Sequence, residues 1–313
     1  MLVRHGAQVN ARNKEGYVAL RDASEGGQLK AVAALLEHGA NVDAVDNRCA
    51  SALCMASPNN HVEVVALLLR KDAQVDLPDN EGYSPLLTAA QEGHPEVVVL
   101  LLGKGAQVDL QDNGCYSPLS MASQNGHLKV VALLLEKGAQ VDLPTNDGAS
   151  PLFKSSQQGH LNVVALLLQK GAQVDLPTKT GATPLFVSAE IGHMAVARLL
   201  LEHGAEVDSR NNGGYSPLSM AAQKGHPEVV ALLLGKGAQV DLASKMGGTS
   251  LFVSSIQGHT ACVRLLLQAG ADPLRRHNDG LTPLGVANAM NHTEVVAVLR
   301  ARIAEVQRER RHR

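Results

Sequence analysis

The chain has 313 residues, of which 45% are hydrophobic and 2% are aromatic, and its formal net charge is −2. This charge argues against general nucleic-acid binding, which needs a basic surface. The longest apolar runs are about eight residues, against the roughly 20 that a membrane-spanning helix needs, so we expect no membrane insertion. The N-terminal stretch "MLVRHGAQVNAR" has no apolar signal-peptide core.

The four cysteines follow no C-x-x-C spacing. Unpatterned cysteines in a long chain favour a reducing compartment over a disulfide framework, so we expect the protein in the cytoplasm, with the nucleus as a second location. These cysteines are Cys49, Cys54, Cys115 and Cys262.

A 33-residue period runs through the whole chain without an insertion. It is set by a proline or its substitute, and repeats at such a period indicate one all-α solenoid in place of separate globular domains. The marking positions are Ala19, Ala52, Pro85, Pro118, Pro151, Pro184, Pro217, Ser250 and Pro283.

Residues 1–12 match only the end of a unit, because Met1 falls in the middle of an expected second helix and Leu2 and Val3 would lie on an unfinished layer. This favours an array that has been truncated from a longer one. The first complete unit is degenerate, since Val18-Ala19 replaces the Ser-Pro of other units. We therefore expect residues 1–45 to open more readily than the centre.

A typical unit predicts two short helices. The first begins at Ser84-Pro85, where a hydroxyl can cap free N–H groups and proline suits the first helical position, and it ends at Gly93. The second runs from Pro95 to Gly105, and the extended loop "AQVDLQDN" follows. Helices of about 8–10 residues are too short to be stable alone, so their stability must come from stacking on neighbouring copies.

The last unit changes the pattern. Arg300 replaces the final leucine of the Leu-Leu-Leu row, and Ile303 replaces glycine. Residues 299–313 then read as a charged capping helix with an arginine-rich tail. From Arg300 onward, six arginines against two glutamates give +4, which leaves −6 for the rest of the chain. A nuclear regulator that uses this basic tail is therefore one alternative function.

The pattern D-x-x-G-x-[ST]-P-L…A-A-x-x-G-H-x-x-V-V-x-L-L-L-x-x-G-A-x-V-[DN] resembles the ankyrin repeat. The resemblance covers residues 13–309 as nine units, and it implies an α-solenoid of stacked helix-turn-helix units with projecting β-turn loops. It also implies protein binding without catalysis, cofactor or small-molecule substrate. The units begin at residues 13, 46, 79, 112, 145, 178, 211, 244 and 277.

Two departures from the family pattern stand out. The histidine that usually follows Pro-Leu is missing from every unit, so its hydrogen bonds are lost, and phenylalanine packing replaces them in three units, at Phe153, Phe186 and Phe252. The glycine of the turn is replaced by Cys49 and Cys115.

Neither the histidines nor the aspartates predict a catalytic or metal site. His61, His94, His127 and five further histidines recur once per layer, and layers about 8–10 Å apart cannot share a zinc ion whose ligands lie about 2.0–2.1 Å away. We expect these histidines to hydrogen-bond the turn beside glycine. The aspartate row from Asp43 to Asp241 supplies nearly identical environments, whereas acid–base pairs need unlike ones. The Ser-Pro serines are expected to be helix caps.

The aromatic residues favour a binding surface. All four tyrosines precede a helix cap, and we expect them to lie outside the Leu/Val stack, as we do the phenylalanines. In the family, the turns and first helices line a concave groove. Tyrosine is a favoured binding anchor, although it can equally cover the neighbouring turn. The predicted groove residues are Tyr83, Tyr116, Tyr215, Asn80, Glu81, Gln91, Glu92, Asn113, Gln124, Asn125, Gln157, Gln158, Gln223 and Lys224.

We therefore predict a monomeric protein-binding module whose concave face takes up a protein or a peptide. The leading alternative is a spacer or scaffold segment of a longer protein, in which the array mainly sets a distance.

Overall fold

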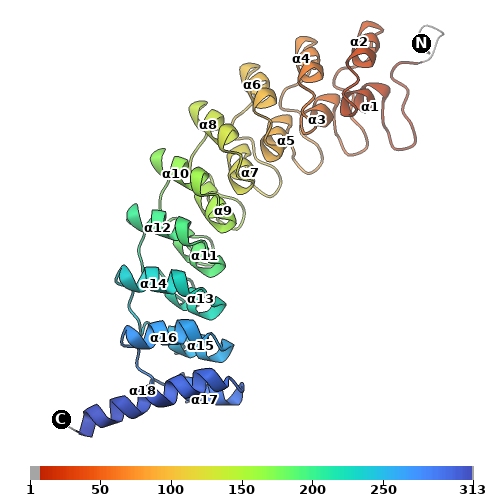
Figure 1. Cartoon of the computed structure of the whole chain (residues 1–313). Helices are drawn as coiled ribbons and strands as arrows, with labels where there is room; N and C mark the ends of the chain where they lie inside the picture. Colours follow the sequence, from red (N-terminus) through yellow and green to blue (C-terminus); the bar gives the residue numbers. More distant parts are fainter. Residues whose placement is uncertain (1–7, 312–313) are drawn as a thin grey trace. The chain divides into compact units, whose positions relative to one another are not determined.

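The computed structural model describes residues 8–311, and its regular structure in this range is helical apart from two isolated β-bridges, Arg12 with Val18 and Val45 with Ser51. Eighteen helices follow one another in this range as nine pairs (Figure 1). The all-α repeat prediction is therefore confirmed. Leu2, Val3 and most of the partial unit predicted over residues 1–12 lie outside the described residues.

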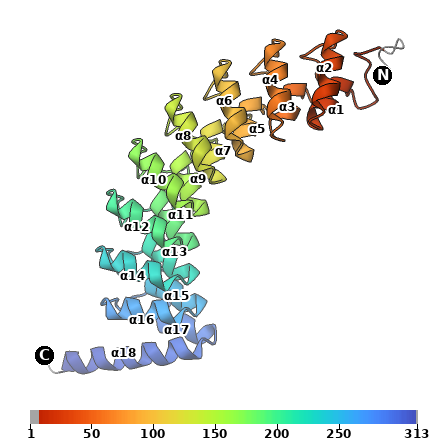
Figure 2. The same cartoon turned by 45° about the horizontal axis from the view of Figure 1, so that its top comes forward.

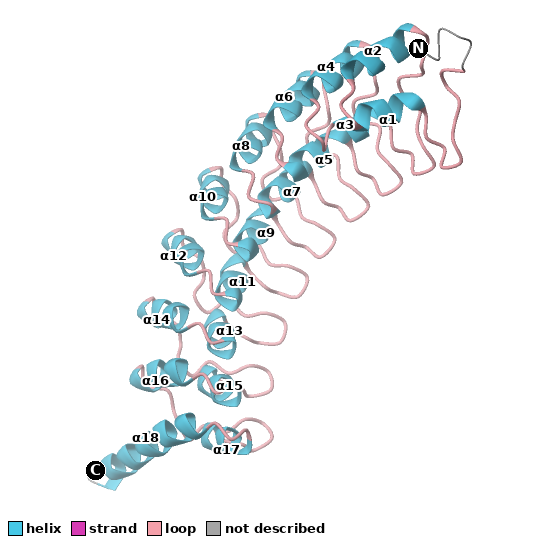
Figure 3. Ribbon diagram, turned by 45° about the vertical axis from the view of Figure 1, so that its right-hand side comes forward, coloured by secondary structure: helices cyan, strands magenta, loops and turns pink. Residues whose placement is uncertain are grey.

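The chain forms two compact units, and the first consists of residues 1–158 and 169–172. Its helices are α1 (Ala19–Glu25), α2 (Leu29–Glu37), α3 (Ala52–Ala56), α4 (Val62–Arg70), α5 (Pro85–Glu92), α6 (Pro95–Gly103), α7 (Pro118–Gln124), α8 (Leu128–Glu136) and α9 (Pro151–Gln158). Within this unit α2, α4, α6 and α8 form one row, α1, α3, α5 and α7 form a second, and the turns extend beyond the second row (Figures 2 and 3).

The second unit consists of residues 159–168 and 173–313. Its helices are α10 (Leu161–Gln169, with its last residue in the first unit), α11 (Pro184–Ile191), α12 (Met194–Glu202), α13 (Pro217–Lys224), α14 (Pro227–Gly235), α15 (Ser250–Gln257), α16 (Thr260–Gln268), α17 (Pro283–Ala289) and α18 (Thr293–Arg311). The same two rows, with turns beyond the first helices, recur here (Figure 3).

A hydroxyl caps the first helix of every pair except the first. Ser84 Oγ accepts a hydrogen bond from the Leu87 N–H at 3.2 Å, and proline at the first helical position gives up an N–H that would have no partner. Gly93 then ends α5 in the left-handed conformation, with φ of 75°. Asn60 and Asn291 make the same left-handed turn in two other repeats, since asparagine tolerates this conformation better than most residues.

The core is a narrow stripe of Leu, Val and Ala that continues through each unit. In the α5–α6 pair the residues Leu86, Val97, Val98 and Leu101 are all 0% exposed. Their neighbours in the core come from the next pair, since α5 packs on α7 and α6 packs on α8. Each pair therefore completes the core of its neighbour.

The histidine row links successive repeats. The Nε2 atoms of six histidines lie 2.8–3.1 Å from a backbone carbonyl of the preceding repeat, to which each can donate a hydrogen bond. The histidines therefore reach the end of the preceding first helix, beyond the turn that the sequence predicted. A Cβ atom built on Gly93 would lie 2.4 Å from Nδ1 of His127, which explains why glycine ends that helix. The six are His61, His94, His127, His226, His259 and His292.

The aspartate row forms a second link. Asp43 Oδ1 accepts a hydrogen bond at 2.8 Å from the backbone N–H of Gln74 in the next repeat, and Asp76 does the same for Gln107 at 3.1 Å. In the second unit Asp208 and Gln239 repeat this bond at 3.1 Å. These carboxylates therefore serve as connections between layers.

The structure corrects the expectation that the phenylalanines lie outside the core. Phe252 is 5% exposed and packs with Val253 and Val286, because a ring at this position points inward. In two of the repeats that lack the family histidine, a serine at its position makes hydrogen bonds of its own. Ser120 Oγ accepts from the Ser117 N–H and donates to the Ser117 carbonyl, both at 2.9 Å.

The histidine link predicts a stability cost. His94 lies 2.8 Å from the Pro58 carbonyl, and we expect His94→Ala to lower the free energy of unfolding by about 1–3 kcal/mol, because a half-buried carbonyl loses its partner. Urea denaturation measures this. His38→Ala is the control, since exposed His38 bonds within its own helix. Equal losses in both variants would contradict the role of the link.

The uncapped start of α1 predicts that adding a cap will increase stability. Val18 precedes α1 without a side-chain cap, whereas Thr183 Oγ1 accepts the Phe186 N–H at 3.2 Å in the same position. We expect Val18→Thr to stabilise α1 by about 1 kcal/mol, because threonine keeps the shape of valine and supplies the cap. Hydrogen exchange of the α1 amides should slow about fivefold. Unchanged exchange, or the same slowing in Val18→Ala, would contradict the prediction.

Candidate functional site

The tyrosines of two adjacent turns in the first unit flank one open hollow of about 470 Å³. Five predicted groove residues line it, and they are joined by three that the sequence analysis did not select. The predicted five are Glu81, Tyr83, Asn113, Tyr116 and Gln124, and the other three are Asp112, Gly114 and Met121.

An aspartate holds each of these turns in shape. Asp112 Oδ1 accepts hydrogen bonds from the backbone N–H groups of Gly114 at 2.9 Å and Tyr116 at 2.8 Å. Asp79 does the same for Glu81 and Tyr83. Because the aspartate bonds the backbone N–H of the tyrosine, it holds in place the part of the turn from which the ring projects.

The two tyrosines have different electrostatic surroundings. The pKa of Tyr83 is raised above its ordinary value, first by burial and then by the negative charges of Asp112 and Glu81. Tyr116 instead carries a cation. Lys154 Nζ lies 5.1 Å from the centre of the Tyr116 ring and donates to its hydroxyl at 3.3 Å. The hollow is therefore negative on its Tyr83 side.

Lys154 is itself held by a carboxylate. Its Nζ lies 3.5 Å from Asp147 Oδ2, and its side chain is 8% exposed. Burial raises the pKa of Asp147, but the Thr145 hydroxyl and then the charge of Lys154 lower it more, so that the net pKa is lowered. A buried lysine with a carboxylate partner thus lies directly against the candidate surface.

The structure does not gather the remaining predicted residues into this hollow. Tyr215, Gln223 and Lys224 belong to the second unit. Asn80 donates its side-chain amide to the preceding turn, to the carbonyl of Asn47 at 3.3 Å. The others lie at the ends of first helices outside the hollow lining, namely Gln91, Glu92, Gln157 and Gln158 within the helices and Asn125 directly after α7.

Comparison with known families decides what this repeated pair of helices is. The model for three ankyrin repeats matches residues 44–112, 108–178, 173–244 and 236–310, and the single ankyrin repeat model matches residues 15–47. The chain belongs to the ankyrin repeat family. Ankyrin repeats are in general protein–protein interaction modules, and the family is typically not enzymatic.

A solved ankyrin structure is similar over most of its length. The crystal structure of the human ASB11 ankyrin repeat domain shares 30% sequence identity, with a TM-score of 0.65, over 71% of this chain and 99% of that one. No curated protein matches the chain in a sequence search.

The ankyrin turns of this chain contain functional candidates that the pattern concealed. Asp112 is the first residue of a repeat, and Met121 and Lys154 lie inside first helices of which only the ends, such as Gln124 and Gln157, were predicted to line the groove. Lys154 had a usable signal, because "PLFKSSQQ" places a lysine where six other repeats have methionine or valine. In the described part of the chain, no three His, Cys, Asp or Glu side chains are placed to hold a metal ion, and no helix is long and apolar enough to cross a membrane.

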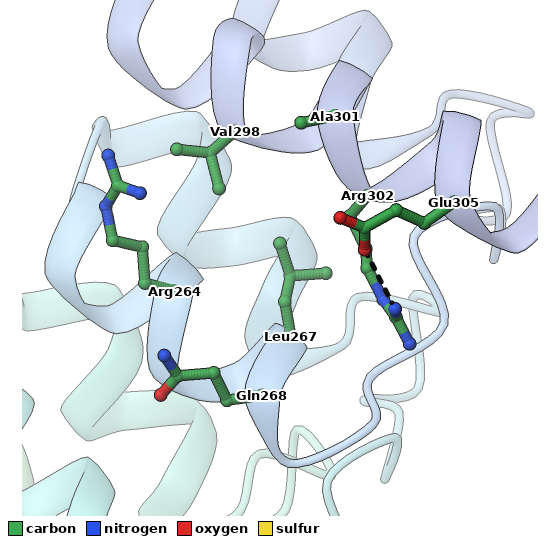
Figure 4. Close-up of a pocket in the computed structure, with 7 residues that line it drawn as sticks. All are labelled: Arg264, Leu267, Gln268, Val298, Ala301, Arg302 and Glu305. Carbon is green, nitrogen blue, oxygen red and sulfur yellow. Dashed lines mark hydrogen bonds and ion pairs between the residues drawn. The ribbon is translucent and has the colours of Figure 1, made fainter.

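A second hollow, of about 360 Å³, lies between α16 and α18 in the second unit (Figure 4). Its two cations already have partners. Arg302 pairs with Glu305 at 3.0 Å, and Arg264 pairs with Glu294 at 3.4 Å. This compensation leaves little positive potential for an anionic ligand, so the Tyr83–Tyr116 hollow is the stronger site.

The ion pair between Lys154 and Asp147 predicts that the pKa of Asp147 changes when the lysine is removed. We expect Lys154→Met to raise the pKa of Asp147, because the cation that favours its charged form is removed. A carboxylate with a lowered pKa stabilises the fold above its unfolded pKa, and this stabilisation disappears as pH falls through the folded pKa. In the Lys154→Met variant, the free energy of unfolding should therefore fall less as pH decreases through the folded pKa of Asp147.

Carboxyl NMR titration of Asp147 measures this shift. Lys137→Met is the matched control, because Lys137 is an exposed lysine of the same unit. An Asp147 pKa that is unchanged in Lys154→Met, or equally changed in Lys137→Met, would contradict the ion pair.

Proposed function

We propose that this ankyrin array binds a partner protein or peptide through the turns and first helices of its first unit, which are part of the predicted concave face. We call this surface, around residues 80–125, the turn face. The observation that carries the proposal is the hollow between Tyr83 and Tyr116, which combines two half-buried aromatic rings with carboxylate and amide groups.

The chemistry of the turn face suits an extended segment. Tyrosine offers a large apolar surface with a polar end at low entropic cost, and such residues dominate protein interfaces. Gln124 lines the hollow, and the Glu81 side chain is exposed at its edge. An extended chain could exchange hydrogen bonds with these groups while one of its side chains fills the hollow.

The tyrosines can be removed without touching the core stripe. We expect the double variant Tyr83→Ala, Tyr116→Ala to weaken binding of the partner by about 2 kcal/mol or more, the scale of interface hot spots. Leu134→Ala, at a residue that is 0% exposed, should instead cost about 2–5 kcal/mol of stability. Affinity capture followed by titration of the identified partner gives the binding, and urea denaturation gives the stability.

The two readouts separate the competing roles of the tyrosines. If the tyrosine variant unfolds as readily as Leu134→Ala, the rings are structural covers of the neighbouring turn. If it stays folded and binds the partner fully, the contact surface lies elsewhere.

The same capture distinguishes the alternatives. A spacer segment would lose no partner in the tyrosine variant, and a regulator that uses the basic tail would lose its partner on removal of residues 300–313.

The proposed cytoplasmic or nuclear placement is supported by four free cysteine thiols.

A further inference from the structure

The first repeat shows how this chain holds a guanidinium group. The Arg21 guanidinium lies 4.0 Å from the centre of the Tyr17 ring, its Nε is 3.3 Å from Asp46 Oδ2, and its terminal nitrogen is 3.6 Å from the sulfur of Met55. The Arg21 side chain is 9% exposed. A tyrosine, an aspartate and a methionine thus form three walls around a buried arginine.

The same three walls recur two repeats later. Tyr83, Asp112 and Met121 each lie 66 residues after Tyr17, Asp46 and Met55, which is two periods of 33. These later residues line the open hollow. The arginine does not recur, because the position 66 residues after Arg21 is Leu87.

Leu87 is 0% exposed, so the chain supplies no cation to the second set of walls from this position. The tyrosines whose rings carry a cation within the described residues are Tyr17 and Tyr116. At Tyr116 the cation is Lys154, which occupies the position one period after Met121.

The charges around Tyr83 favour a cation. Asp112 is 9% exposed, and one of its oxygens already accepts two backbone N–H groups. Glu81 lines the same hollow with an exposed side chain. The pKa of Tyr83 is raised first by burial and then by the negative charges of nearby groups, of which Asp112 and Glu81 act most strongly on this ring.

We propose that the Tyr83–Asp112–Met121 hollow is a receptor for an arginine side chain presented by an extended segment of the partner protein. The guanidinium lies on the Tyr83 ring, as that of Arg21 lies on Tyr17, and it donates hydrogen bonds to Asp112 and Glu81. Arginine suits the hollow better than lysine, because its planar group stacks on an aromatic face while it bonds a carboxylate. This inference rests on the proposed function and names the chemistry of the partner.

The test uses the full chain and a defined probe. The probe is the heptapeptide Gly-Ser-Gly-Arg-Gly-Ser-Gly with both ends blocked, so that its one charge is the guanidinium. Matched peptides replace arginine with citrulline, which keeps the shape without the charge, or with lysine. NMR titration that follows the Gly114 amide and the Tyr83 ring gives each dissociation constant.

We expect the arginine peptide to bind about tenfold or more tightly than the citrulline peptide, with lysine between them, since a charge-assisted bond is lost with citrulline. Asp112→Asn should weaken the arginine peptide about tenfold and leave the fold intact. Asn211 already makes the same turn in the second unit, where its Oδ1 accepts from the N–H groups of Gly213 and Tyr215 at 3.0 Å.

Three further variants test the position. Tyr83→Leu should abolish arginine selectivity, whereas Tyr215→Leu should retain it, because Val253 and Ser244 replace the methionine and aspartate walls there. Leu87→Arg restores the arginine of the first repeat without the Asp22 and Glu25 that also pair with Arg21, since Thr88 and Gln91 take their places. The new side chain should fill the hollow from within and prevent peptide binding.

Equal affinity for the arginine and citrulline peptides, or undiminished affinity in folded Asp112→Asn, would overturn the inference. If a protein partner depends on Tyr83 and Tyr116 but these peptide results fail, the proposed function stands and the arginine receptor is wrong. If the peptide results hold and no protein partner depends on the two tyrosines, the receptor stands and the proposed function falls.

Discussion

Within each of the two units, the stacking of one helix pair on the next is the interaction on which every other feature depends. A first helix such as α5 has eight residues, fewer than an isolated helix needs in water, and its buried residues find their partners in the neighbouring pair. The histidine and aspartate links act across the same boundary between repeats. Because the stack fixes the spacing of successive turns, it also fixes which turn residues can act together.

This division assigns different tasks to repeated and unrepeated residues. The residues that recur in nearly every repeat cap helices, fill the core stripe or link layers, and they leave little freedom for chemistry. Recognition must therefore come from positions where the repeats differ. Tyr83 and Met121 are such positions and both line the hollow, while Lys154 contacts Tyr116 at its edge. Tyr83 lies half-buried in a turn, so a change there alters the surface with little effect on the stack, whereas Met121 and Lys154 are buried.

The period made the fold predictable from sequence, because a 33-residue spacing with Ser-Pro and glycine signals specifies the helix starts and ends in each unit. The tyrosine pair at the hollow was predictable for the same reason. Asp112 and Met121 were not, since their importance depends on how residues 29 and 38 positions after a tyrosine meet its ring, which only the packed layers show. Lys154 was missed because only the end of its helix, Gln157 and Gln158, was predicted to face the groove. The predicted role of the phenylalanines was wrong, because the direction of a side chain within a short helix does not follow from spacing alone.

The central claim is that the shared residues build the stack and the unshared residues of the turn face bind. A crystal structure of the full chain with the arginine heptapeptide tests this claim most directly. The account predicts that the guanidinium lies on the Tyr83 ring within hydrogen-bonding distance of Asp112, with the peptide backbone along the turns and first helices of the first unit. A peptide bound along the second helices, or held by residues that recur in every repeat, would contradict it.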